Sequence, residues 1–107
     1  MIFYWDAWNR DHATRHGVTE NESRYAIEHM RQPDPQPAGD DKLSVWGPTV
    51  DGRLLQVVYV ELPPERIEIE NLTWMDLLKL EEGAKITYII HARELTWDEK
   101  RIFRRRR

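Results

Sequence analysis

Residues 85–103, KITYIIHARELTWDEKRIF, contain the pattern that decides the fold. β-Branched and aromatic side chains dominate residues 85–93, which predicts a strand. Thr96 and Glu99 then have the spacing of a capping box, which predicts a helix that begins just after Thr96. This strand and its capped helix form the frame on which the preceding segments have to pack.

Two hydrophobic segments upstream are predicted to pair with this strand. Leu43 to Gly47 and Arg53 to Val60 read as strands, and Asp51-Gly52 between them is a typical hairpin turn. Ile2 to Trp5 is short, apolar and aromatic, and is expected at an edge. We therefore expect a small antiparallel sheet.

Two helices are predicted between the first strand and the hairpin. Asp6 is the expected cap of a helix through residues 7–16 that ends at Gly17. Thr19 and Glu22 form a capping box for a second helix that reaches about Met30. The next residues, 32–41, are QPDPQPAGDD, and three prolines at alternate positions predict an exposed loop.

Residues 61–84 are an insertion between the last two predicted strands. Its IEI segment, residues 67–69, is expected to form a short strand, and Thr73 to cap a helix that ends at Gly83. Trp74, Leu77, Leu78 and Leu80 are expected to pack onto the body. The whole chain, 1–107, is interpreted as one α+β domain, because no repeat and no strand–helix–strand succession of a parallel sheet is present.

Composition restricts the class of protein. The 107 residues are 40% hydrophobic and 33% charged, which is typical of a soluble globular chain. The lack of cysteine excludes disulfides, thiolate metal sites and cysteine nucleophiles. No apolar run approaches the roughly 20 residues that span a bilayer, and the first residues lack the pattern of a signal peptide. We expect a cytoplasmic protein without membrane association.

The charge is distributed unevenly. The net charge of −3 combines +4 in residues 93–107 with −7 in residues 1–92. A basic segment of this kind suits phosphate or an acidic protein partner, and charge alone does not decide between them. The alternative for the arginine run at 104–107 is a solvated helix end, where cations complement the helix dipole.

His91 and Arg93 are predicted to project from the same face of the last strand. Alternation would group Ile86, Tyr88, Ile90 and Ala92 towards the core, and Thr87 and Ile89 with His91 and Arg93 on the other face. Arginine holds phosphate through two donors, and histidine exchanges protons near neutral pH, so the pair suits phosphodiester chemistry. The structural alternative is a surface ion pair of Arg93 with Glu94 or Glu99.

Two further patterns have weaker functional meaning. His12 and His16 have an i, i+4 spacing that binds zinc when a third ligand is present, but a polar helix face is the simpler interpretation. The five tryptophans suit either base stacking or the core of a small domain. No metal or cofactor is therefore expected.

Three segments, taken together, resemble the BrnT-type toxins. These segments are WDAWNRDHATRHGVTENES at 5–23, VWGPTVDGRLLQVVYVE at 45–61 and IIHARELTWDEKRIF at 89–103. The resemblance implies a RelE/ParE-like fold and a toxin of a type II toxin–antitoxin pair. Such a toxin cleaves RNA without a metal and is neutralised by a cognate antitoxin protein.

The resemblance also implies roles for individual residues. Arg93 matches the family's arginine after alanine, Glu99 the glutamate of the last helix and Arg53 a basic position after the hairpin, while Arg101 is a looser match. His91 stands where serine is common, so its role comes from this sequence alone.

The resulting hypothesis is a metal-independent endoribonuclease that uses attack by the RNA 2′-hydroxyl. Arg93 and Arg101 would hold the phosphate, and His91 or Glu99 would accept the 2′-hydroxyl proton. Arg53, Arg104 and Arg105 would assist RNA binding. The alternative is a non-catalytic module that docks a partner protein or nucleic acid through its basic C-terminal end.

Overall fold

The chain folds around one mixed sheet, as seen in a computed structural model that describes residues 1–106. Across these residues there are four α-helices and five strands, so the α+β prediction is confirmed. The strands are β1 (Ile2–Phe3), β2 (Gln36–Pro37), β3 (Lys42–Pro48), β4 (Leu54–Leu62) and β5 (Ile86–Glu94). The helices are α1 (Ala7–Thr14), α2 (Glu20–Glu28), α3 (Trp74–Glu81) and α4 (Trp97–Arg104).

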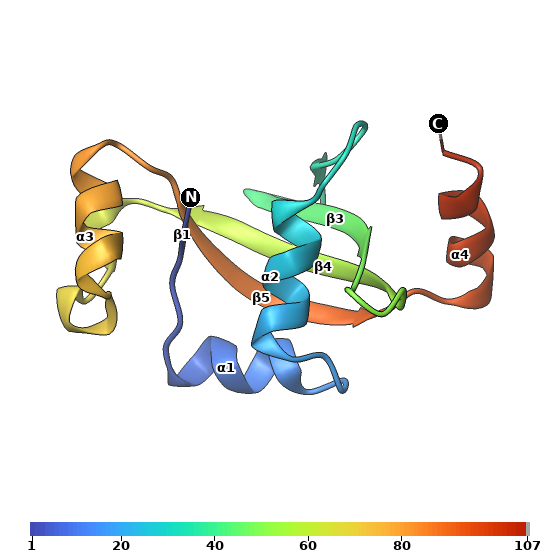
Figure 1. Ribbon diagram of the computed structural model, residues 1–107, viewed down its shortest axis with the longest axis horizontal. Helices are drawn as coiled ribbons and strands as arrows, with labels where there is room; N and C mark the ends of the chain where they lie inside the picture. The colour runs from blue at the N-terminus through green and yellow to red at the C-terminus, as the bar shows by residue number, and fades with distance from the viewer. Residues whose placement is uncertain (107) are drawn as a thin grey trace.

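The strand order is β1-β5-β4-β3-β2 (Figure 1). Three neighbouring pairs are antiparallel, but β1 runs parallel to β5, so the expectation of a purely antiparallel sheet is wrong at this edge. The proline-rich segment was predicted to be a loop over its whole length, but it contains the two-residue strand β2. β2 pairs with β3 at the opposite edge, where proline is tolerated because one side of the strand has no ladder partner.

All four α-helices of residues 1–106 begin with a capping box, as the sequence predicted for α2 and α4. In α4 the Thr96 side chain accepts from the backbone N–H of Glu99, and the Glu99 side chain accepts from that of Thr96. These reciprocal bonds satisfy amides that have no partner inside the helix. They also fix the position at which each helix leaves the preceding segment.

The main core lies between the sheet and the two N-terminal helices. α2 crosses β3 and β4, and α1 lies along β5 (Figure 1). Gly47 of β3 is needed at the contact with α2, because a Cβ there would lie 3.3 Å from the backbone oxygen of Ala26. The buried cluster is apolar: Phe3, Ala13, Val18, Ala26, Ile27, Val45, Leu55, Val57, Tyr59, Ile89 and Ala92.

A β-bulge at Ile90 changes which residues of β5 share a face. Val58 pairs with His91, but the adjacent Tyr59 pairs with Ile89, so Ile90 has no opposite residue in β4. An extra residue of this kind shifts the alternation by one position. The predicted common face of His91 and Arg93 is confirmed, because both follow the bulge.

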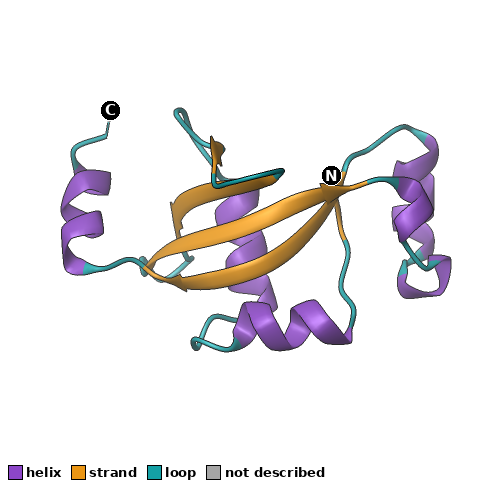
Figure 2. Cartoon of the chain, turned by 180° about the vertical axis from the view of Figure 1, so that it is seen from behind, coloured by secondary structure: helices purple, strands orange, loops and turns teal. Residues whose placement is uncertain are grey.

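The predicted core position of Ala92 is also confirmed, but the predicted faces of Tyr88 and Ile89, which precede the bulge, are reversed. Ile89 and Ala92, from opposite predicted faces, both lie in the main core, on the side of Leu55 and Val57. We call the opposite side the open face; it carries Trp46, Gln56, Val58, Tyr88, His91 and Arg93. Figure 2 shows this side: within residues 1–106 no helix crosses its middle, and α3 and α4 stand at its two ends.

The insertion forms a second, smaller cluster at the far end of the sheet. Its predicted IEI strand is wrong, since residues 64–66 and 69–71 form two 3₁₀ turns. The Tyr4 hydroxyl accepts from the Glu68 backbone N–H and the Asn71 side chain, both at 3.0 Å. Leu72 and Leu80 pack beside Ile2, Tyr4 and Ile86. The expected burial of Trp74 and Leu78 is wrong, because these side chains are exposed.

In the part of the chain that the structure describes, no helix combines the length and the apolar character that crossing a bilayer requires.

Candidate functional site

Two of the predicted catalytic residues, Arg93 and Glu99, bind each other across the junction between β5 and α4. Arg93 donates from Nη1 and Nη2 to the two carboxylate oxygens of Glu99, at 2.7 and 2.9 Å. It also donates to the side chain of Gln56 and, at 3.1 Å, to the backbone oxygen of Glu94. The ion pair that sequence analysis named as the structural alternative is therefore present, and it fixes α4 to the sheet.

This contact controls the protonation of Glu99. Hydrogen bonds from Arg93, with further help from Thr96, lower the pKa of Glu99 to about 2. The same carboxylate raises the pKa of Arg93. Both groups are consequently charged at any physiological pH. Such a weakly basic carboxylate is unsuited to removing a proton from a hydroxyl near neutral pH.

His91 has a different environment, two residues away on the open face. Its ring lies 5.1 Å from that of His16, centroid to centroid, with the ring planes at 64°. Burial, followed by the positive charges of His16 and Arg93, lowers the pKa of His91 below its usual 6.5. At pH 7 His91 is therefore a neutral imidazole, the form that accepts a proton.

His16 is a residue whose proximity to His91 sequence reasoning missed. It follows the end of α1, where Gly17 with a φ of 76° turns the chain towards α2. In the sequence, His16 was notable only for its i, i+4 spacing from His12, which suggested a zinc ligand. Because α1 and β5 are far apart in sequence, their contact depends on the completed fold and has no local signal.

An aromatic ledge, formed by Trp8, His12 and Tyr88, continues this edge of the open face. The Trp8 ring stacks on His12 at 3.7 Å and lies nearly parallel to Tyr88 at 6.2 Å. Trp8 remains half exposed. The hydroxyl of Tyr88 donates to Asp6, the cap of α1, so the ledge is fixed to the start of the helix.

Arg53, a predicted RNA-binding residue, does not join Arg93. It lies 3.4 Å from Glu94 and 3.7 Å from Glu22, and it donates to the backbone oxygen of Gly17 at 3.3 Å. Its Nε is buried and makes no hydrogen bond, although it lies 3.4 Å from a carboxylate oxygen of Glu94. Glu94 pairs with Leu55 and so belongs to the core side of the sheet. Arg53 consequently links α2 to the hairpin on that side.

The arginines of α4 separate into different environments. Arg101 pairs with Asp98 at 2.6 Å, with both side chains exposed, and within residues 1–106 it makes no hydrogen bond or ion pair with Arg93 or His91. Arg104 and Arg105 are exposed. Arg107, the last residue of the predicted basic run, lies outside the described residues.

Arg106 is the exception within this run. It donates to the buried carboxylate of Asp34 at 2.9 Å, and Asp34 also accepts from the Trp46 backbone N–H at 3.0 Å. The Arg106 guanidinium lies 4.7 Å above the Trp46 ring. In the sequence the run looks like a uniform basic surface, and nothing local indicates this contact, because its acidic partner is in the proline-rich segment.

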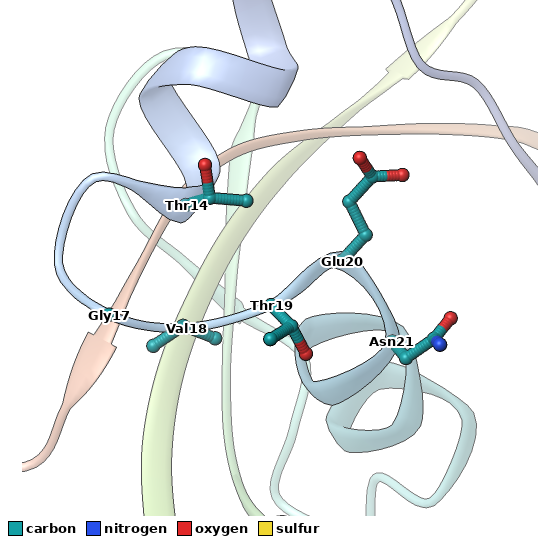
Figure 3. Close-up of a pocket in the computed structure, with 6 residues that line it drawn as sticks. All are labelled: Thr14, Gly17, Val18, Thr19, Glu20 and Asn21. Carbon is teal, nitrogen blue, oxygen red and sulfur yellow. The ribbon is translucent and has the colours of Figure 1, made fainter.

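A shallow depression of about 540 Å³ lies between the end of α1 and the start of α2 (Figure 3). Thr14, Gly17, Val18, Thr19, Glu20 and Asn21 line it, and no predicted site residue is among them. Thr19 and Glu22 already occupy helix-start amides of α2 through their capping box. The depression therefore does not mark the chemistry predicted from the sequence.

The zinc alternative for His12 and His16 has no third ligand nearby. Among residues 1–106 no three histidine, cysteine, aspartate or glutamate side chains converge in a way that would hold a metal ion. His12 instead uses Nδ1 towards the backbone oxygen of Trp8 at 2.8 Å. Because a carbonyl only accepts, Nδ1 carries the proton there.

Comparison with models of protein families finds no match to this chain. Comparisons with curated proteins and with solved structures find no match either. The resemblance to BrnT-type toxins stays a prediction from the sequence.

Proposed function

We propose that this protein is an endoribonuclease that cleaves single-stranded RNA without a metal, at the edge of the open face around His91. The observation that carries the proposal is the contact of the His91 and His16 rings, 5.1 Å apart, beside Arg93. Two imidazoles that flank one phosphodiester provide both the proton acceptor and the proton donor that transesterification requires.

In this mechanism neutral His91 accepts the proton of the RNA 2′-hydroxyl. The 2′-oxygen then attacks phosphorus, and the bond from phosphorus to the 5′-oxygen breaks. Protonated His16 donates a proton to that leaving oxygen. The products are a 2′,3′-cyclic phosphate and a 5′-hydroxyl, and a later proton exchange with water restores both histidines.

Glu99 has a positioning role in this proposal. The pKa of about 2 argues against Glu99 as the base, so His91 takes the role that the sequence left open between the two. Glu99 and Gln56 instead hold the Arg93 guanidinium at a fixed place beside His91, where it adds positive charge near the phosphate. The aromatic ledge supports the adjacent base, because exposed aromatic rings stack with any nucleobase.

The resemblance of the three sequence segments supports a RelE/ParE-like fold and a toxin role within the same proposal. A cognate antitoxin would then neutralise the protein by covering the open face. Growth arrest on expression, relieved by His91→Gln, is the expected cellular effect.

The test is RNA cleavage in EDTA by matched preparations of wild type, His91→Gln, His16→Gln and Lys85→Gln. We expect the first two variants to lose roughly 100-fold or more in rate, and cyclic phosphate ends on the wild-type products. Lys85, whose side chain is 72% exposed and which belongs to neither proposed site, is the control and should cleave as wild type does. Equal cleavage by His91→Gln and wild type would exclude the proposed site.

A non-catalytic binding module is the second candidate, and a separate feature of α4 favours it. α4 has no buried residue, and Trp97 and Ile102 on it are 70% and 55% exposed. Together with Arg101 and Arg105 they form an apolar and basic surface suited to a partner. This candidate expects stable capture of a partner, abolished by Trp97→Ala, with no RNA cleavage by the wild type.

A further inference from the structure

A second cavity, separate from the His91 edge, lies between α2, the proline-rich segment and α4. Its volume of about 540 Å³ is within the usual range for small-molecule sites. Tyr25 of α2 and His29, which follows its last residue, line one side together with Arg31. Trp46 of β3 with Phe103 and Arg104 of α4 completes the wall. The cavity therefore draws on segments far apart in sequence.

The wall formed by Trp46 of β3 and Phe103 of α4 is aromatic. The Arg106 guanidinium lies over both rings, 4.7 Å from the centroid of Trp46 and 5.5 Å from that of Phe103. Across the cavity, the rings of Tyr25 and His29 stack at 3.9 Å. Planar surfaces of this kind accept a planar heterocycle by stacking.

The charge around the cavity is positive. Arg31 and Arg104 line it, and within residues 1–106 neither has an ion-pair partner. The one acidic side chain in the wall, Asp34, is buried and already binds Arg106 and the Trp46 backbone. The two exposed guanidiniums are therefore available to an anion, and phosphate is the anion that suits their forked donors.

The wall is also held in place before any ligand arrives. Asp34 connects the proline-rich segment to β3 through the Trp46 amide and to α4 through Arg106. Arg93 and Glu99 fix the start of α4 at the sheet. A pre-formed wall reduces the ordering cost of binding.

We infer that this cavity binds a nucleoside monophosphate group, with the base against the wall of Trp46, Arg106 and Phe103 and the phosphate on Arg31 and Arg104. The group is either a free nucleotide or the phosphorylated end of a nucleic-acid strand. A purely apolar ligand would leave the arginines without a partner, and inorganic phosphate would leave the aromatic wall unused.

The test follows the indole N–H signal of Trp46 by NMR, assigned with Trp46→Phe, during titration with adenosine monophosphate. We expect a saturable shift with a Kd below about 1 mM. Adenosine and inorganic phosphate, each offering half of the contacts, should bind at least about tenfold more weakly. A short RNA with a terminal phosphate provides the second arm: tighter binding than the mononucleotide identifies a strand end, and equal or weaker binding identifies a free nucleotide.

Variants decide whether the cavity is the place of binding. Arg31→Gln and Arg104→Gln should each weaken binding about five- to tenfold, since each loses a charged contact to phosphate. Arg101→Gln and Arg105→Gln change exposed arginines outside the cavity and are the matched controls. His91→Gln should bind as wild type does, so a failure of the ribonuclease proposal leaves this result unaffected.

Three outcomes would overturn the inference. They are the absence of a saturable shift up to about 10 mM nucleotide, wild-type affinity in both cavity variants, and equal affinity for inorganic phosphate and the nucleotide.

Discussion

Arg93 and Glu99 bind through two parallel hydrogen bonds, 2.7 and 2.9 Å long, across the turn that joins β5 to α4. Glu99 belongs at the same time to the capping box of α4. One carboxylate thus determines both where the helix begins and how it is fixed to the sheet. For this reason the pair has consequences for stability that are separate from any role in chemistry.

Glu99→Gln should lower the free energy of unfolding by about 1–2 kcal/mol at pH 7, because the neutral amide loses the ionic bonds to Arg93. Since folding lowers the pKa of Glu99 to about 2, its contribution is complete above about 4.5 and is lost as the pH falls towards 2. Urea unfolding of both proteins at several pH values measures this. The difference between them should shrink on acidification.

Asp98→Asn is the control for that measurement. Asp98 lies on the same helix turn, but its bond to Arg101 is between exposed groups. We expect a change within about 0.5 kcal/mol at pH 7. A loss in Asp98→Asn equal to that in Glu99→Gln would mean that any negative charge in the first turn of α4 has this effect, and that the contact with Arg93 is not its cause.

His91 should titrate below 6.5 in an NMR titration of the histidine ring signals. His16→Gln removes one of the positive charges that lower the pKa, so the midpoint of His91 should move upward. Burial is the larger cause and persists in the variant, so the midpoint should stay below 6.5. Because the unfolded chain binds this proton more readily, stability should fall as the pH drops below 6.5. An unchanged midpoint in His16→Gln would mean that the two imidazoles do not interact in solution.

Arg106→Ala should destabilise the protein by about 2–3 kcal/mol, because it leaves the buried carboxylate of Asp34 without its cation. Arg105→Ala, one position away and exposed, should change the free energy of unfolding by less than about 0.5 kcal/mol. Thermal unfolding of the two variants measures the contrast. Similar effects in both would mean that the C-terminal arginines act as a uniform charge, as the sequence alone suggested.

Tyr4→Phe should loosen the insertion and leave the main sheet intact. The lost hydroxyl is the acceptor for the Glu68 amide and the Asn71 side chain. Hydrogen exchange should show reduced protection at the Glu68 amide, with unchanged protection in β4 and β5. Tyr25→Phe, which removes a hydroxyl from α2, is the matched control. An equal loss of protection at the Glu68 amide in Tyr25→Phe would contradict this role for Tyr4.

Local sequence signals predicted most of the elements, because their causes are local. Thr96 with Glu99 and Thr19 with Glu22 form the capping boxes that their spacing predicted. The short IEI segment failed, since its β-branched residues have no strand to pair with and prolines precede it.

The faces of β5 and the composition of the site were harder to predict. The bulge at Ile90 results from the pairing register with β4. No property of Ile90 itself predicts this register. The contact of His91 with His16 and that of Arg106 with Asp34 join residues 75 and 72 positions apart. Their identification requires the folded arrangement of helix, loop and sheet.

The parallel pairing of β1 with β5 also affects the order of folding. Ile2 lies opposite Ile86, so this edge closes a loop of 84 positions. The hairpin of β3 and β4 closes through a short turn and needs no such search. Long-range contacts form slowly because the loop entropy is lost before the contact energy is gained. We therefore expect the hairpin to form early and the β1 edge to lock last, which makes the docking of β1 the step that completes the sheet.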